Sequence, residues 1–461
     1  MRVPQFLATM LVCLAVLFPF ASVSQTQTVK IIYSFDGTVG ELPRYVTLGQ
    51  GQDGQLYGTA TYGGANNFGS VFKINTSGKA TLLHSFTLAD GTSPNGGLTL
   101  AGDGNLYGTV GAGSVYTGAI YKITPSGEYV TVRGLSVTEG SYPSSPPIYS
   151  SDGSLYGTAY EGGNSRLGTV YKIRDGGPSV IYQYDYTHGQ HPISSPLQGL
   201  DGKLYVTSES GGAHFNGTAL QLSTEGALEN TYSFDLATTG VDPEPSLVWG
   251  SDGNLYGTTG GGGADSDGVL YKLSTNFDYT ALHTFGTITS DGKYPAGVVQ
   301  ATDGNFYGMT QAGGTFGGGT IYSYALSGSY QTLYNWNAHN VLLLLYEQGA
   351  LVQHTNGKFY GVTYGGGASL LGTVFSFDVG LGPFVALVQN QGRAGSTAQI
   401  LGQGFTGTTS VAFNGVPATS FTVVKDTFMK AVVPTGATSG PVIVTTPTGF
   451  LKSNKSFRII N

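Results

Sequence analysis

Charge, cysteine and long apolar runs are all scarce in this sequence of 461 residues. Charged residues make up 10 % of it, against roughly 25 % in an ordinary soluble domain, and the formal charge is −7. Without a basic footprint, nucleic acid is not an expected partner. The single cysteine, Cys13, leaves no disulfide and no cysteine-based metal site. Aromatic residues reach 12 %, which excludes a disordered chain, and the 74 glycines follow no Gly-x-y period, which excludes collagen.

The first 24 residues have the order of a targeting segment. Arg2 precedes an apolar run over 6–20, and small residues follow at 21–24. This order predicts a secretory signal peptide over 1–24 that is cleaved near Ser24. A retained membrane anchor is the alternative, although the run is shorter than the roughly 20 residues that span a bilayer. We therefore expect a protein that is secreted, extracellular or at the cell surface, with the periplasm as the other compartment, and that has no membrane span after cleavage.

One short phrase occurs seven times. Its tyrosines are 50, 49, 49, 51, 51 and 53 residues apart, and each phrase follows an Asp-Gly or Asn-Gly pair. Such a pair between apolar runs is a strong hairpin signal, because a type I′ turn needs a positive φ at both central residues. Each phrase is therefore predicted to be the second arm of a tight hairpin. The phrases are 55–58, 105–108, 154–157, 203–206, 254–257, 305–308 and 358–361.

Each repeat contains four apolar runs, here called strands a to d, and no helical period. Four-stranded meanders that repeat in this way are typical of a β-propeller, so seven repeats predict a seven-bladed β-propeller. The last repeat has no strand d after 374–377. An isolated run at 31–35 stands in step with the other d strands, since Tyr33 and His84 are 51 residues apart. We expect this N-terminal strand to complete the last blade and close the ring.

These residues resemble a known family of tandem repeats. The x-Leu-Tyr-Gly-Thr phrase, the Gly-Gly stretch behind it and strands such as Gly-Thr-Val-Tyr-Lys-Ile at 168–173 are similar to the GloVer repeat of exported bacterial proteins. The resemblance covers roughly 29–378 and implies a bacterial extracellular protein. That family is known by its repeat and not by an activity, so it implies no catalytic residues.

A second domain is predicted after the repeats, which extend over 28–378 and end at a linker over 379–383. Short strands with Gly and Pro turns over 384–461 predict a small all-β sandwich. The order of Gly402 to Phe405, Val411 to Gly415 and Gly440 to Val444 resembles the IPT/TIG module, which is immunoglobulin-like. Such modules imply a spacer or a binding unit.

No set of catalytic residues can be assigned. No serine has Gly at both −2 and +2, as an esterase nucleophile would, and the seven Asp or Asn residues before Gly are explained as turn formers. Four glutamates occur in single repeats only, as a functional acid would, but surface drift gives the same pattern. They are Glu161, Glu209, Glu244 and Glu347. We expect no catalytic residue, no metal site and no cofactor.

The b–c loops vary between repeats while the a–b turns are uniform. A fixed frame with varied loops is how many scaffolds carry recognition. Flat aromatic rings among Asn, Ser and Gly suit sugar rings, although they could equally pack their own loops. The predicted ligand-binding residues are Tyr62, Phe68, Tyr116, His214, Phe215, Phe316 and Tyr364.

The leading hypothesis is an exported, non-enzymatic binding or surface-interaction protein. Its expected partner is an extracellular polysaccharide, a cell-envelope polymer or a surface protein, and the chain itself is expected to be a monomer. The alternative is a secreted polysaccharide lyase or glycoside hydrolase that acts at the face of the b–c loops. The absence of an assignable acid–base set favours binding.

Overall fold

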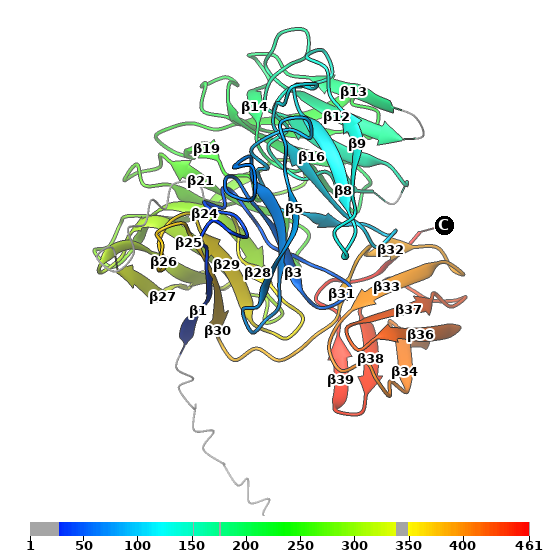
Figure 1. The fold of residues 1–461 in the computed structure, drawn as a ribbon. Helices are drawn as coiled ribbons and strands as arrows, with labels where there is room; N and C mark the ends of the chain where they lie inside the picture. The colour runs from blue at the N-terminus through cyan, green and yellow to red at the C-terminus, as the bar shows by residue number, and fades with distance from the viewer. Residues whose placement is uncertain (1–26, 151, 175–176, 338–348, 461) are drawn as a thin grey trace, which may run out of the picture.

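The computed structural model describes residues 27–150, 152–174, 177–337 and 349–460 (Figure 1). Their regular elements are strands, and this part of the chain contains no helix long and apolar enough to cross a membrane. The predicted signal peptide over 1–24 lies outside the described residues.

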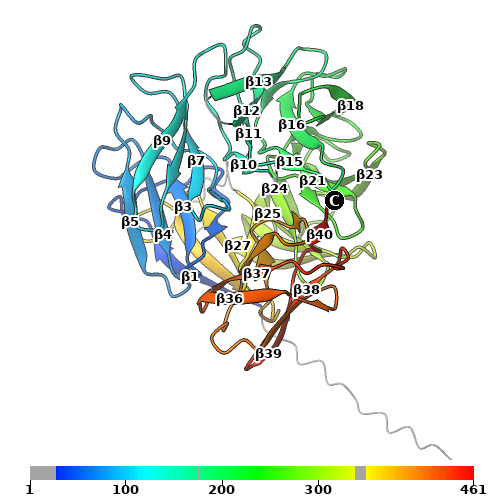
Figure 2. The ribbon, with the colours of Figure 1, turned by 90° about the vertical axis from the view of Figure 1, so that its right-hand side faces the viewer.

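Antiparallel sheets of four or five strands follow one another along residues 28–378 and surround a common axis, which is the arrangement of a β-propeller (Figure 2). Seven such sheets lie within the described residues. The first four sheets comprise β2 (Gly49–Gln50), β3 (Leu56–Ala60), β4 (Ser70–Ile74) and β5 (Ala80–Ser85); β6 (Thr99–Leu100), β7 (Leu106–Val110), β8 (Ala119–Ile123) and β9 (Tyr129–Gly134); β10 (Ile148–Tyr149), β11 (Leu155–Ala159), β12 (Thr169–Arg174) and β13 (Gly177–Gln183); β14 (Gln190–Pro192), β15 (Leu197–Gln198), β16 (Leu204–Ser210), β17 (Thr218–Leu222) and β18 (Leu228–Ser233). The other three comprise β19 (Val241–Pro243), β20 (Val248–Trp249), β21 (Leu255–Gly261), β22 (Val269–Leu273) and β23 (Tyr279–Thr284); β24 (Gly292–Gln300), β25 (Phe306–Gly313), β26 (Gly317–Tyr324) and β27 (Tyr330–Asn337); β28 (Val352–Gln353), β29 (Phe359–Thr363), β30 (Thr373–Asp378) and β1 (Thr28–Ser34).

The N-terminal strand completes the last of these sheets. β1 pairs antiparallel with β30, with Thr28 opposite Asp378 and Ile31 opposite Phe375. The backbone of Phe35 also donates to the carbonyl of Gly372, at 3.0 Å. The first and last repeats are therefore joined by strand pairing, as the spacing of the repeats predicts.

The a–b turns differ from the predicted type I′ geometry. In the first repeat the N–H of Gly54 donates to the carbonyl of Gly51 at 3.1 Å, and only the glycine takes a left-handed φ, of 72°. The turn is thus a type I turn followed by a left-handed glycine, and the prediction of two positive φ values was wrong. Besides its place in the turn, Asp53 stabilises the start of strand b. Its carboxylate accepts hydrogen bonds from the Gln55 N–H at 3.2 Å and from the Tyr57 hydroxyl at 2.8 Å.

That bond between the turn and strand b recurs around the ring. The tyrosine follows the aspartate or asparagine by four residues in each repeat. The hydrogen bond between them therefore holds the start of strand b against the turn that precedes it. The pairs are Asp103–Tyr107, Asp152–Tyr156, Asp201–Tyr205, Asp252–Tyr256 and Asp303–Tyr307, and in the last repeat Asn356 donates to Tyr360 instead.

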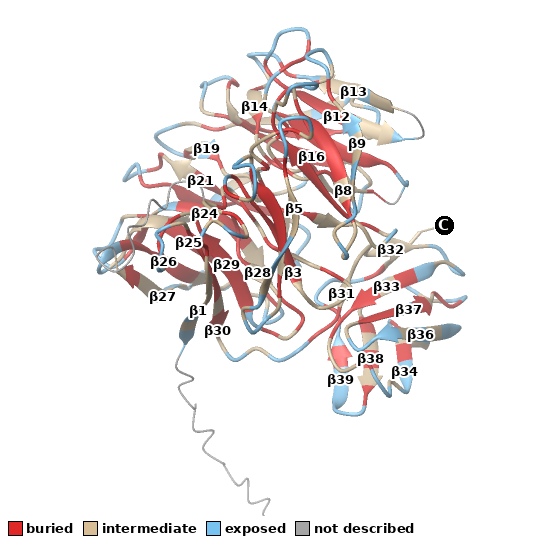
Figure 3. Cartoon of the chain, in the orientation of Figure 1, coloured by how far each residue is buried: buried red, intermediate tan, exposed pale blue. Residues whose placement is uncertain are grey.

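The hydrophobic core lies between neighbouring sheets. The middle strands of the sheets are the most buried parts of the ring (Figure 3). Tyr256 of the fifth sheet stacks on Phe306 of the sixth, with ring centroids 4.1 Å apart. A Cβ on Gly257 would come within 2.5 Å of the Tyr271 hydroxyl on the partner strand, so glycine is needed there. Threonine hydroxyls in strand b donate hydrogen bonds to backbone carbonyls of the following repeat. Thr258, for example, donates to the carbonyl of Ala296 at 2.6 Å.

Residues 384–460, hereafter the C-terminal module, form two further four-stranded sheets and a short parallel pair. The side chains of Ile400, Phe413, Met429, Val444 and Phe457 fill the space between them. The sheets comprise β31 (Ala386–Leu387), β33 (Thr397–Leu401), β37 (Phe428–Val432) and β36 (Ser420–Lys425), and β35 (Val416–Pro417), β34 (Ser410–Phe413), β38 (Val442–Thr446) and β39 (Gly449–Lys452); β32 (Gln391–Gly392) pairs with β40 (Arg458–Ile459).

The C-terminal module packs on the a–b turns of the ring (Figure 1). The Thr427 hydroxyl donates to the carbonyl of Gln52, and the Gln399 amide donates to the carbonyl of Gly102. Within the ring, the buried His354 in the a–b turn of the last sheet forms a hydrogen bond with the carbonyl of Gly54 in the turn of the first sheet, at 3.0 Å. The C-terminal module thus covers part of this face of the ring (Figure 2).

Candidate functional site

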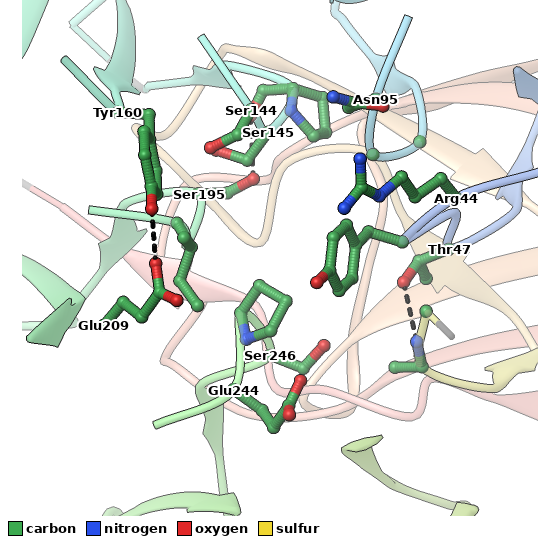
Figure 4. Close-up of a pocket in the computed structure, with 18 of the residues that line it drawn as sticks. Arg44, Thr47, Asn95, Ser144, Ser145, Tyr160, Ser195, Glu209, Glu244 and Ser246 are labelled. Carbon is green, nitrogen blue, oxygen red and sulfur yellow. Dashed lines mark hydrogen bonds between the residues drawn. The ribbon is translucent and has the colours of Figure 1, made fainter. Parts of the chain in front are cut away.

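A cavity of about 1230 Å³ opens at the face of the ring that lies opposite the a–b turns. Its walls are the segments that enter strand a and the far ends of several b strands. Figure 4 shows that polar side chains from different repeats point into this space from several sides.

A recurring Gly-x-x-Pro turn builds the mouth of the cavity. The residue before the proline adopts a left-handed φ of 51° to 57° in six repeats, although none of these residues is glycine. Such a conformation is costly for other residues and is held here by pairing with the end of strand b, as between Ser141 and Glu161. The six residues are Leu42, Ser93, Tyr142, His191, Asp242 and Tyr294, of which Ser93, Tyr142, Asp242 and Tyr294 line the cavity.

The residue after that proline also lines the cavity in five successive repeats, and it differs in chemistry each time. The five are Arg44, Asn95, Ser144, Ile193 and Glu244. One backbone position therefore places a cation, an amide, a hydroxyl, an apolar group and a carboxyl around a single space. Figure 4 labels four of them, Arg44, Asn95, Ser144 and Glu244.

One side of the cavity is acidic. The Tyr160 hydroxyl donates to the Glu209 carboxylate at 2.8 Å, and the Tyr160 ring stacks on His191 with centroids 4.6 Å apart. The Glu244 carboxyl lies over Gly260, where an added Cβ would come within 2.7 Å of its Oε1. Glycine at 260 thus makes the room that Glu244 occupies.

Two carboxyl groups on the acidic side of the cavity have raised pKa values. Burial, together with the charges of Asp242 and Glu209, raises the pKa of Glu244 to about 8. Partial desolvation at the cavity wall and the charge of Glu209 raise the pKa of Asp242 to about 6, although the residue is still exposed. No hydrogen bond or ion pair from another described residue reaches the Glu244 carboxyl, so nothing offsets its desolvation. At neutral pH this carboxyl is protonated and can donate a hydrogen bond, whereas Glu209 accepts one.

The residues predicted for ligand binding lie on the b–c loops, outside the lining of the cavity. Tyr62, Tyr116, Phe215 and Phe316 are exposed, with Phe215 at 70 %. Phe68 is half-buried against the core between the first two sheets. The half-exposed His214 lies 3.8 Å from Asp235, and the half-buried Tyr364 follows strand b at the repeat position that Tyr160 and Glu209 occupy in the cavity.

Sequence reasoning missed most of the cavity. It considered Glu161, Glu209 and Glu244 as single-repeat acids but did not place them together, and it did not consider Arg44, Asn95 or Ser144. The fourth such acid, Glu347, lies outside the described residues. The sequence does contain an indication of the cavity wall. The residues on both sides of the proline in the Gly-x-x-Pro turn vary from repeat to repeat, while the proline itself recurs. Among the described residues, no group of three or more His, Asp and Glu is placed to hold a metal ion.

Comparisons with known proteins agree with the repeat analysis. The chain matches the Gloeobacter/Verrucomicrobia repeat over residues 15–195 and 152–344. The chain belongs to the Gloeobacter/Verrucomicrobia repeat family. No curated protein matches this member of the family.

Solved structures resemble this repeat protein only distantly. The periplasmic gluconolactonase of Pseudomonas aeruginosa is 16 % identical, with a TM-score of 0.44 over 71 % of this chain and 97 % of the other. Hydrazine synthase of Kuenenia stuttgartiensis is 11 % identical, with a TM-score of 0.43 over 64 % and 96 %. A putative gluconolactonase is 13 % identical, with a TM-score of 0.38 over 65 % and 92 %. These values are too low to transfer an activity.

Proposed function

We propose that this chain is an exported, non-enzymatic binding protein that takes a carbohydrate or a cell-envelope polymer into the cavity. In this proposal the repeats form a seven-bladed β-propeller, the C-terminal module is an immunoglobulin-like IPT/TIG domain, and the b–c loop aromatics form an outer rim. The observation that carries it is the cavity of about 1230 Å³, whose walls combine hydroxyl, amide and carboxyl groups with tyrosine rings. Saccharides offer hydroxyl groups that donate and accept at short intervals, and their ring faces pack on aromatic side chains.

The charges of the cavity favour a neutral sugar at its acidic side. Glu209 and Asp242 repel an anion, whereas a sugar hydroxyl can donate to Glu209 and accept from the protonated Glu244. The varied side chains after the recurring proline give five repeats different contacts, so the cavity suits one asymmetric ligand and not a symmetric one.

A glycan panel with two matched variants tests this proposal. Ser144→Phe fills the cavity from a half-buried position and should abolish saturable binding. Ser126→Phe adds the same ring to an exposed turn at the face of the a–b turns and should leave binding unchanged. Equal binding by both variants would show that recognition does not use the cavity. Subsequent loss in the rim variant Phe316→Ser would then locate it on the b–c loops.

A secreted glycoside hydrolase or polysaccharide lyase is the second candidate. The pKa of Glu244 at about 8 and that of Asp242 at about 6 would give one protonated and one ionised carboxyl at pH 7, which is the division that acid–base catalysis uses. Release of reducing ends from a panel of polysaccharides, lost in both Glu244→Gln and Asp242→Asn, would support catalysis. Binding without product would support the first proposal.

A further inference from the structure

A second cleft lies where the C-terminal module meets the ring. It holds about 450 Å³ between Thr302, in the a–b turn of the sixth sheet, and the segment 450–456 of the C-terminal module. It is separate from the central cavity, with which it shares no lining residue.

The C-terminal module differs in charge from the rest of the chain. Residues 384–461 contain six Lys and Arg but Asp426 as the only acid, which gives a formal charge of +5 in a chain whose total is −7. A charge asymmetry of this kind points to an anionic partner for the basic part.

Two of these cations line the cleft. Lys452 and Lys455 form no ion pair with another described residue, and none of their ammonium groups donates a hydrogen bond to one. Desolvation lowers the pKa of Lys455 with no neighbouring carboxylate to oppose it, although the side chains of Lys452 and Lys455 are both exposed. An ammonium group without a counter-ion is stabilised when an anion enters beside it and accepts its hydrogen bonds.

The segment that carries these lysines is held in place before any ligand arrives. The Ser453 hydroxyl donates to the carbonyl of Lys455 at 2.7 Å and accepts from the N–H of Val442 at 2.9 Å. The N–H of Asn454 donates to the carbonyl of Val385 at 3.1 Å. Because the backbone is fixed, binding costs little ordering entropy there.

An aromatic ring completes the cleft. Phe450 and Lys452 point to the same face of β39, since the buried Leu451 between them points to the core. Phe450 is 75 % exposed, and β39 is an edge strand of its sheet. An exposed ring beside two ammonium groups offers stacking to a sugar face together with charge for its carboxylate.

We propose that this cleft binds a carboxylate-bearing saccharide, such as a uronic acid residue of an acidic polysaccharide. Lys452 and Lys455 pair with the carboxylate, and Phe450 packs against the sugar ring. This site is additional to the central cavity and does not depend on the function proposed for it.

The test measures binding of fluorescently labelled oligogalacturonate to the full chain at about 0.15 M salt, where exposed charges are screened beyond about 8 Å. The wild-type protein should bind it at least about ten-fold more tightly than the same oligomer with its carboxyl groups reduced to alcohols. The double variant Lys452→Gln/Lys455→Gln should lose about ten-fold or more in affinity. Phe450→Leu should weaken binding while the charge is unchanged.

The matched control is Lys430→Gln, which removes one charge from an exposed position of the same module outside the cleft. This control should bind the oligomer as tightly as the wild type does. An equal loss of affinity in the control would show that only the total charge of the module matters, and would overturn the proposal. Displacement of the oligomer by inorganic phosphate at equal concentration would show a simple anion site, which also overturns it. Loss of oligogalacturonate binding in Ser144→Phe would place the site in the central cavity instead. Thermal unfolding of each variant separates lost binding from lost fold, and Phe450→Leu serves if the double variant is unfolded.

Discussion

Replacing Glu244 by glutamine should stabilise the protein at alkaline pH and leave it unchanged at about pH 4 and below. The carboxyl lies among Asp242 and Glu209, over Gly260, and has no described partner that favours its ionised form. Glutamine has nearly the same shape but cannot ionise, so the variant removes only the cost of the charge.

The sign follows from proton linkage. The pKa of Glu244 is about 8 in the folded protein, against 4.5 for an ordinary glutamate. The folded state therefore holds more protons than the unfolded state between these two values, and stability falls as pH rises through this window. At about 1.36 kcal/mol per pKa unit, the cost reaches an upper limit of about 5 kcal/mol above pH 8. Water in the open cavity screens the charge, so we expect a gain of about 1–3 kcal/mol for the variant at pH 9.

Chemical denaturation at several pH values measures this gain, because the unfolding free energies of the variant and the wild type should converge at about pH 4 and separate towards pH 9. Glu161→Gln is the matched control, since it removes an exposed carboxylate at the rim of the same cavity. A constant difference across the pH range, or an equal gain in the control, would refute a desolvated carboxyl at 244.

Three further predictions address the ring and its rim. Deletion of residues 27–36 removes the outer strand of the last sheet and should lower the temperature of unfolding, and an unchanged temperature would contradict closure by β1. Leu106→Ala should cost about 2–5 kcal/mol in denaturant unfolding, since this side chain is fully buried between the first two sheets, and a value near zero would show that its packing was misread. Combined replacement of Tyr62, Phe215 and Phe316 by serine should weaken binding of a ligand found in the glycan panel while preserving the fold, because the three side chains are exposed; unfolding would show that they pack their own loops.

The ring could be predicted from the sequence because strand pairing and repeat spacing act on every copy alike. The displaced N-terminal strand was visible as a run in step with the other d strands, and β1 does pair with β30. The fourth phrase has Val206 where the other six have glycine, and the residue on the paired strand gives the reason. Gly257 lies opposite Tyr271 on the paired strand, and the tyrosine leaves no room for a side chain. Val206 lies opposite the smaller Leu220, so a valine can replace the glycine there.

The turn geometry and the cavity were harder to predict for different reasons. Asp-Gly is compatible with more than one turn, and the hydrogen bond from Tyr57 to Asp53 becomes visible only when strand b is folded back on its turn. The cavity gathers residues from repeats that are far apart in the sequence, such as Asn95 and Glu244, and no local pattern connects them. A single residue that differs between repeats gives no indication of what stands beside it across the ring.

The two ends of strand b explain why variation accumulates at one face of the ring. At the first end, the Asp–Tyr hydrogen bond involves the same atoms in six successive repeats, so a change there disturbs the hairpin. At the other end, the Gly-x-x-Pro turn is fixed by its backbone, through the left-handed residue and its pairing with strand b. The side chain after the proline carries no part of that pairing. Arg44, Ile193 and Glu244 can therefore differ in charge and polarity while the same frame holds each of them at the wall of the cavity.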